Sequence, residues 1–174
     1  MKKLLLSLLF IASSVTLSAQ IILSGVSPSS VQGNYEFAWA DPGGGDWSCP
    51  DFNIPGTFIQ GELMLVDDGS TGTNPQGNPI SAEGCNPLVN DLTGKIAIIF
   101  RNTCEFGTKA LNAQNAGAIG AIIVNREEEV IQMGGGANGL SVTIPVGFIK
   151  LSDGLNLINA MGDDPVEMFF GNRA

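Results

Sequence analysis

Alternating apolar and polar positions in the first half of the chain predict β-strands separated by loops. Segment 35–39 carries an aromatic residue at every second position, a period typical of a half-buried strand. The glycine-rich segment 41–46 cannot continue this strand and predicts a loop. The mainly apolar run 58–66 predicts a second strand, and the small and polar residues of segment 69–81 predict an exposed loop after it.

The middle of the chain has the pattern of a strand, a helix and a second strand. Residues 96–100 form a short, continuous apolar run, which is typical of a strand buried on both faces. Phe106, Ala110 and Ala113 then share one face of a predicted helix. A second apolar run at 119–124 follows, so these segments predict a βαβ unit with two parallel strands and a right-handed crossover.

The last third of the chain predicts a loop, a strand and a capped helix. Segment 133–139 is rich in glycine and has no periodicity, so it predicts a flexible loop. Residues 143–149 predict a strand, and the proline near its start favours a place at the edge of the sheet. Ser152 can cap a helix that begins at Asp153.

A closing strand is predicted at 166–170, and no internal repeat, second core or long linker divides the chain. Antiparallel-looking strands followed by a βαβ unit predict an α+β domain with a small mixed β-sheet and flanking helices.

The N-terminus has the pattern of a signal peptide. Two lysines follow Met1, residues 4–11 are apolar except for Ser7, and small residues precede a cleavage site after Ala19. The alternative, a membrane anchor, needs about 20 mainly apolar residues, and polar residues occur too early here for that. We therefore expect residues 1–19 to be removed and the chain to be secreted, extracellular or periplasmic, with no stable membrane anchor.

Charge and composition exclude several classes of function. The 174 residues contain 8 Lys and Arg against 17 Asp and Glu, a formal net charge of −9 at pH 7. Such a chain lacks the basic surface that phosphate backbones require, so we expect no nucleic-acid partner. It also contains no histidine, which removes Ser-His-Asp and Cys-His catalysis and histidine metal sites.

Acidic and glycine-rich loops are the candidate cofactor sites. Asp41, Asp46 and Asp51 could gather around Ca²⁺, but their spacing matches no calcium loop, so chance acidity is favoured. The glycines at 134–136 lack the Lys-Ser/Thr that a phosphate-binding loop requires. We therefore expect no cofactor and no bound metal.

Several short motifs follow one another in a characteristic order. They are Leu65-Val66-Asp67-Asp68-Gly69, Cys85-Asn86-Pro87-Leu88, Gly94-Lys95-Ile96-Ala97-Ile98-Ile99, Arg101-Asn102-Thr103-Cys104-Glu105-Phe106, Asn112-Ala113-Gln114-Asn115-Ala116-Gly117-Ala118, Ile122-Ile123-Val124-Asn125, Ile144-Pro145-Val146 and Ser152-Asp153-Gly154. In order and spacing these motifs resemble the protease-associated (PA) domain family. The resemblance covers roughly residues 33–171 and leaves 20–32 as an N-terminal segment.

The resemblance implies an open, β-barrel-like core and a non-catalytic module that binds protein or peptide segments or covers an active site. The chain is then not an enzyme, and its partners are protein or peptide segments, including a secreted peptidase. The alternative is a regulatory or substrate-recruiting module of a secreted peptidase whose catalytic domain lies outside this chain. A hydrolase with paired carboxylates is a third hypothesis, but no motif marks such a pair. The chain departs from the family at Asn102, where the family usually has glycine after arginine.

The resemblance also favours one disulfide among three cysteines. Cys85 and Cys104 fall at positions that match family cysteines, and the short strand between them lets the chain return. Such a bridge would contribute about 3 kcal/mol by the loop-entropy estimate. The rival pairings use Cys49, which the favoured pairing leaves unpaired.

Two peptide-binding surfaces are predicted. Arg101 follows a parallel strand and could anchor an acidic peptide group, although a structural salt bridge to a carboxylate is the alternative. The predicted edge strand at 143–149 could pair with an added peptide strand next to the glycine loop. The residues predicted for this second surface are Gly134, Gly135, Gly136, Val146 and Phe148.

Overall fold

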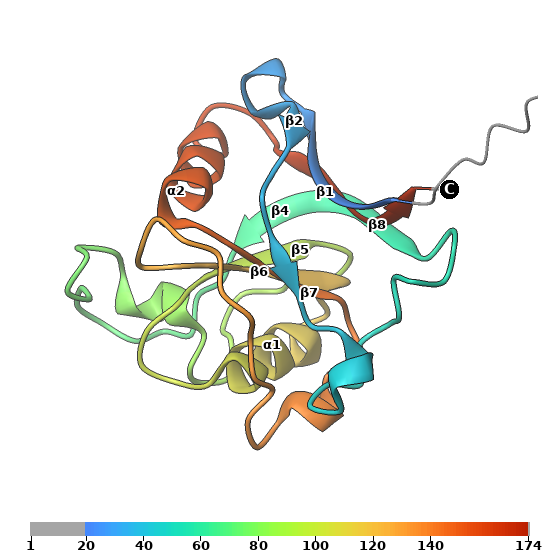
Figure 1. Ribbon diagram of the computed structural model, residues 1–174. Coiled ribbons are helices and arrows are strands. Elements are labelled where there is room, and N and C mark those ends of the chain that lie inside the picture. The colour runs from blue at the N-terminus through green and yellow to red at the C-terminus, as the bar shows by residue number, and fades with distance from the viewer. Residues whose placement is uncertain (1–19, 174) are drawn as a thin grey trace, which may run out of the picture.

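The computed structural model describes residues 20–173, and the predicted signal peptide lies outside them. Eight strands form one curled mixed sheet in the spatial order β2-β1-β8-β4-β5-β6-β7-β3, with two α-helices packed on it (Figure 1). The elements are β1 Gln20–Ser27, β2 Gly33–Asn34, β3 Ala38–Trp39, β4 Phe58–Leu65, β5 Ile96–Phe100, α1 Phe106–Asn115, β6 Gly120–Val124, β7 Val146–Ile149, α2 Leu151–Ala160 and β8 Glu167–Arg173. Short 3₁₀ turns lie at η1 Ser29–Val31, η2 Pro42–Gly44, η3 Ile80–Glu83 and η4 Gly139–Ser141.

Strand β4 joins an antiparallel half of the sheet to a parallel half. Residues 58–62 of β4 pair antiparallel with β8, and residues 63–65 pair parallel with β5. Strands β5, β6 and β7 continue the parallel half. The predicted mixed sheet and the predicted βαβ unit, β5-α1-β6, are therefore confirmed.

The parallel strands are buried on both faces because a different core cluster packs on each. Ala97 and Ile99 of β5 lie in the cluster that includes Ala110 and Ala113 of α1. The alternate residues of β5 lie in the second cluster, which includes Leu157 of α2. Small alanines bring α1 close to the sheet, and the sheet separates the two helices.

The sheet begins earlier in the sequence than predicted. Strand β1 pairs with β8 from Gln20 to Ser27, and Leu23 in its middle is fully buried. The fold therefore includes residues 20–32, which the sequence had left outside the domain. The residues before β1 carry an apolar pattern of their own, which hid the start of the strand.

The prediction that 143–149 forms an edge strand is wrong. Strand β7 starts at Val146 and pairs with β6 on one side and with β3 on the other. Segment 35–39 contributes only Ala38 and Trp39 as a strand, and these two residues are the ones that cover β7. Proline at 145 precedes the strand rather than marking an exposed edge.

Helix α2 begins at Leu151 rather than at Asp153. The predicted cap, Ser152, donates instead to a carboxylate oxygen of Glu128, with an Oγ–Oε2 distance of 2.6 Å. Lys150, in an extended conformation, occupies the N-cap position.

Neither helix in residues 20–173 is long and apolar enough to cross a membrane.

Candidate functional site

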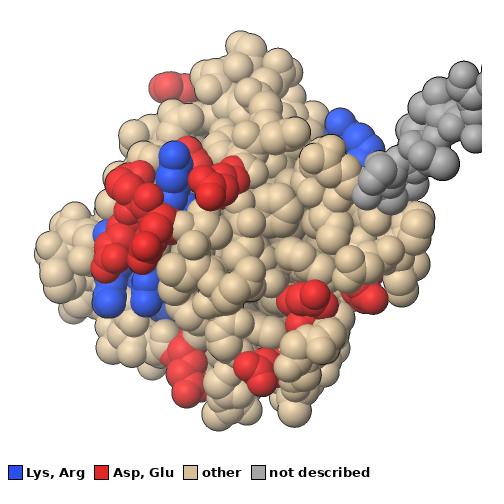
Figure 2. Space-filling model, in the orientation of Figure 1, with Lys and Arg blue, Asp and Glu red and all other residues tan. Residues whose placement is uncertain are grey.

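A basic residue follows each of three parallel strands at their carboxyl ends. Arg101 follows β5, Arg126 lies just beyond β6, and Lys150 follows β7. Ligands commonly bind at this edge of open α/β sheets. In Figure 2 the largest group of charged side chains in the view lies beside α2 and the loop after β6.

A hollow of about 290 Å³ lies next to the ends of β5 and β6, and we call it the β5–β6 hollow. Loop 73–83 forms one wall, and the segments after the two strands form the other. Amides, hydroxyls, apolar groups and two opposite charges share its lining, which consists of Thr73, Asn74, Pro75, Ile80, Glu83, Asn102, Thr103 and Arg126.

Glu83 holds the two walls of the β5–β6 hollow together. Its side chain is buried, and Oε2 accepts hydrogen bonds from the backbone N–H of Thr103 at 3.2 Å and from its hydroxyl at 2.8 Å. Oε1 accepts from Nδ2 of Asn74 at 3.2 Å. Burial acts to raise the pKa of Glu83, but the hydrogen bonds from Thr103 and Asn74 outweigh it and place the pKa below its ordinary value. Glu83 is therefore a buried, ionised carboxylate.

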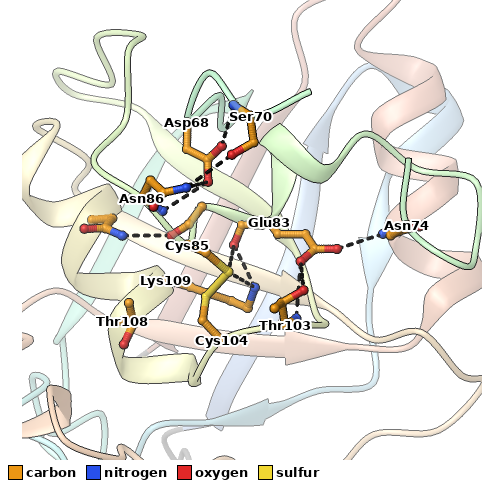
Figure 3. The surroundings of a disulfide bond; sticks show 12 residues. Asp68, Ser70, Asn74, Glu83, Cys85, Asn86, Thr103, Cys104, Thr108 and Lys109 are labelled. Atoms are coloured by element: carbon orange, nitrogen blue, oxygen red, sulfur yellow. Dashed lines mark hydrogen bonds between the residues drawn. A yellow bond between two sulfur atoms is a disulfide. The ribbon is translucent and has the colours of Figure 1, made fainter. Parts of the chain in front are cut away.

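Lys109 of α1 is fully buried and contacts the backbone of Glu83. Its Nζ donates to the backbone oxygen of Glu83 at 2.7 Å and lies 3.6 Å from Sγ of Cys85 (Figure 3). Burial lowers the pKa of Lys109 to about 8, although the charges of Glu83 and Asp68 act in the opposite direction.

Asp68 organises the loop on the other side of the disulfide (Figure 3). Its two oxygens accept from the backbone N–H of Ser70 at 3.0 Å and of Asn86 at 3.1 Å. Burial acts to raise the pKa of Asp68, and the hydrogen bonds from Ser70 and Asn86 lower it below its ordinary value.

The predicted disulfide between Cys85 and Cys104 is confirmed, and Cys49 is free and buried. The bridge joins the segment just after Glu83 to the segment just after Thr103. It thus fixes the same two segments that the Glu83 carboxylate joins by hydrogen bonds.

Arg101 does not form the salt bridge to a carboxylate that was the alternative to a binding role. Its Nη1 donates to Oδ1 of Asn125 at 2.8 Å, and its guanidinium lies over the ring of Phe106, 5.7 Å from the centroid. Arg101 thus ties the end of β5 to the end of β6 and to α1. The cation among the lining residues of the β5–β6 hollow is instead Arg126, which was not among the predicted site residues.

Arg126 forms an ion pair with the neighbouring residue, Glu127. Its Nε lies 3.5 Å from Oε1 of Glu127, and both side chains are largely exposed. An exposed pair of this kind is weak, so the guanidinium can exchange its partner for a ligand carboxylate.

The structure contradicts the second predicted binding surface. Val146 and Phe148 are 1% and 0% exposed, so neither can contact a peptide. The glycine loop is also held more firmly than predicted. The backbone N–H of Ala137 donates to Glu105 at 3.0 Å, and a Cβ on Gly135 would overlap the carbonyl oxygen of Asp46.

The neighbouring glycines, Gly134 and Gly136, are exposed. A Cβ on Gly136 would nevertheless overlap the carboxylate of Glu105. Gly136 has φ +59°, a conformation that favours glycine. Gly135 and Gly136 therefore serve close packing and a turn, whereas a Cβ on Gly134 would make only an ordinary contact with Asp46.

Two of the three aspartates that could gather around Ca²⁺, Asp41 and Asp51, serve local turns. Asp41 accepts from the backbone N–H of Gly43, and Asp51 accepts from that of Asn53, both at 2.8 Å. Among residues 20–173 no group of three or more potential ligands is arranged to hold a metal ion.

Comparison with known sequences gives one family and several relatives. The model of the PA domain family matches residues 59–157. Human ER degradation-enhancing alpha-mannosidase-like protein 3 is 35% identical over 104 residues, which are 53% of this chain and 11% of that protein. Aminopeptidase YwaD of Bacillus subtilis (strain 168) is 36% identical over 115 residues, which are 59% of this chain and 25% of that protein. The chain thus spans only a small part of these relatives.

Solved structures share the fold at low sequence identity. An aminopeptidase from Aneurinibacillus sp. strain AM-1 matches with a TM-score of 0.56 and 20% identity, over 89% of this chain and 33% of that one. The zinc aminopeptidase BSAP of Bacillus subtilis matches with a TM-score of 0.52 and 20% identity, over 90% of this chain and 35% of that one. At this identity the likeness concerns the fold alone.

Proposed function

This chain belongs to the PA domain family, and from that premise we propose that it is an exported, non-catalytic module that binds a protein or peptide segment in the β5–β6 hollow. The observation that carries the proposal is the lining of that hollow, where amides, a hydroxyl and Arg126 face an open space at the strand ends. Amide and hydroxyl groups can pair with a peptide backbone, and Arg126 can pair with a carboxylate on the ligand.

The size of the hollow favours a short segment of a larger partner. Its volume of about 290 Å³ lies at the lower end of the range for small-molecule pockets, roughly 300–1,000 Å³. Ile80 and Pro75 contribute apolar groups to its lining, which can contact one apolar side chain of a ligand. The carboxylate of Glu83 is already hydrogen-bonded to Thr103 and Asn74, so it competes little for the ligand.

The chemistry of the hollow supports binding rather than catalysis. Thr103 and Glu83 form a hydroxyl–carboxylate pair, which resembles a nucleophile and its base. The pKa of Glu83 is below its ordinary value, however, which makes it a weak base at neutral pH. We therefore infer that a bound peptide leaves the hollow uncleaved.

A second candidate function is that of a recruiting module within a secreted peptidase. Aminopeptidases occur among the proteins similar to this chain in sequence and in fold, and the chain covers only part of each. The length of the native open reading frame distinguishes a module from a stand-alone binding protein.

Arg126→Gln is expected to weaken the binding of acidic peptides about tenfold or more, because a charge-assisted hydrogen bond contributes about 1.5–3 kcal/mol. The measurement is fluorescence anisotropy with labelled octapeptides of acidic and neutral composition. The matched control is Arg173→Gln, since Arg173 lies on β8 over the ring of Phe169 and away from the hollow.

Equal loss of affinity in both variants would point to general electrostatic attraction and contradict the proposed site.

Mass spectrometry of the peptides after incubation tests the non-catalytic part of the proposal. Steady peptide cleavage by the wild-type chain that Thr103→Val abolishes would overturn it.

Export is inferred from the signal-like pattern of residues 1–19. N-terminal sequencing of the native protein is expected to give Gln20 as its first residue. A retained Met1 in the membrane fraction would contradict this.

A further inference from the structure

The disulfide lies against a buried ammonium group that has no anionic partner in contact. Nζ of Lys109 is 3.6 Å from Sγ of Cys85, and its hydrogen bond goes to a neutral carbonyl, the backbone oxygen of Glu83. Among the described residues no Asp or Glu oxygen lies within 4.0 Å of this nitrogen. A buried charge without a contacting counter-ion is costly.

Reduction of the disulfide would supply the missing counter-ion. The thiolate of Cys85 would form next to the Lys109 ammonium in a partly buried site, where an opposite charge lowers a thiol pKa strongly. The charges of Glu83 and Asp68, beyond contact distance, also favour the protonated form of Lys109. The oxidised protein gains no comparable ion pair, so the lysine selectively stabilises the reduced state.

We propose that Cys85–Cys104 is a thiol–disulfide exchange site for a dithiol reductant, in which Lys109 stabilises Cys85 as the leaving thiolate. The inference rests on Lys109 and the bridge, and it is independent of what the β5–β6 hollow binds. Both cysteines are partly exposed, so a reductant can reach the bridge from solvent.

The exchange takes place in two balanced steps. A thiolate of the dithiol attacks Sγ of Cys104, forms a mixed disulfide with it and expels Cys85 as a thiolate paired with Lys109. The second thiol of the reductant is then deprotonated and attacks the first sulfur of the reductant, which is bonded to Cys104. The Cys104 thiolate leaves and takes up a proton. The dithiol loses two electrons and becomes a disulfide, and the protein gains them as two reduced cysteines.

The direction of attack follows from the position of the lysine. Lys109 contacts the sulfur of Cys85 and no contact is found with that of Cys104 (Figure 3). The better leaving group is the thiol of lower pKa, so attack on Cys104 is favoured. In the reduced protein, Cys85 is expected to have the lower pKa of the two.

The first test uses the wild-type chain reduced with dithiothreitol. The rate of iodoacetamide alkylation of each cysteine, followed by peptide mass spectrometry across pH, gives its thiol pKa. We expect the pKa of Cys85 to lie at least one unit below the ordinary value of about 8.5, as an adjacent opposite charge produces. A Cys85 pKa of 8.5 or above, whether the reduced chain remains folded or not, overturns the proposal.

The second test compares Lys109→Gln with a matched surface control, Lys95→Gln, whose lysine pairs with Glu62 away from the bridge. The equilibrium with dithiothreitol at pH 8 is expected to shift about tenfold toward the disulfide in Lys109→Gln, or about 30 mV. The pKa of Cys85 should return to about 8.5 in that variant. An unchanged equilibrium and thiol pKa in Lys109→Gln, or an equal shift in Lys95→Gln, would show that Lys109 acts only in packing.

Discussion

Replacing Glu83 with alanine is expected to destabilise the fold by about 3 kcal/mol or more, because hydrogen bonds to a charged group contribute about 1.5–3 kcal/mol each. The change removes the acceptor of three hydrogen bonds from Thr103 and Asn74. It also removes one of the two carboxylates whose charges favour the protonated form of Lys109. Urea denaturation at pH 7 followed by circular dichroism measures the loss.

The contribution of Glu83 should also depend on pH. Because its pKa is lower in the folded chain, the unfolded chain takes up a proton first as the pH falls. This part of the stability is present above the unfolded pKa of about 4.3 and is lost as the pH falls through the folded pKa. The wild-type chain should therefore lose more stability in acid than Glu83→Gln does.

Glu62→Gln is the matched control for Glu83. Glu62 pairs with Lys95 at 2.8 Å on the surface, and such pairs contribute about 0–1 kcal/mol. A loss in Glu83→Ala no larger than that in Glu62→Gln would contradict the structural role assigned to the buried carboxylate.

Elements with a strong local period could be predicted from the sequence. Strand β5, helix α1 and strand β6 each carry their own apolar pattern, and their order alone implies parallel pairing. These elements lie within one βαβ unit, so few long-range contacts were needed to infer them.

The neighbours of the other strands could not be predicted, because their pairing partners lie far apart in the sequence. Two residues of β3 pair with β7 on the side away from β6. Nothing in the sequence near Val146 indicates this pairing. Strand β1 was missed because its apolar residues come directly after the signal-like pattern of residues 1–19. The false edge at β7 followed from treating a proline as evidence of exposure when it only precedes the strand.

The site was predicted in part. Arg101 lies at the carboxyl edge as expected, but it supports the loops, and Arg126 lines the β5–β6 hollow. Glu83 gave no signal, since a glutamate in a polar loop looks like any solvated residue. Lys109 did give one, because it lies three residues after Phe106 and four before Ala113, on the apolar side of α1. A lysine at such a position indicates a buried charge that needs a partner.

Removing the disulfide is the other change with a large expected effect. Cys85→Ser combined with Cys104→Ser should lower the free energy of unfolding by about 3 kcal/mol, within the range of about 2–5 for native bridges in small secreted domains. The bridge closes a loop with a sequence separation of 19, and without it the unfolded chain gains conformational freedom. Chemical denaturation of the oxidised wild type and the double variant measures the difference.

Cys49→Ala is the control for this prediction and should cost only about 1 kcal/mol, because it removes one small buried group. Burial raises the pKa of the Cys49 thiol to about 12, so it should resist alkylation in the folded protein. Non-reducing peptide mapping of the wild type should accordingly give one peptide pair linked through Cys85 and Cys104. If the double serine variant were as stable as Cys49→Ala, the hydrogen bonds of Glu83 alone would suffice to hold the two segments together, and the bridge would be dispensable for the fold.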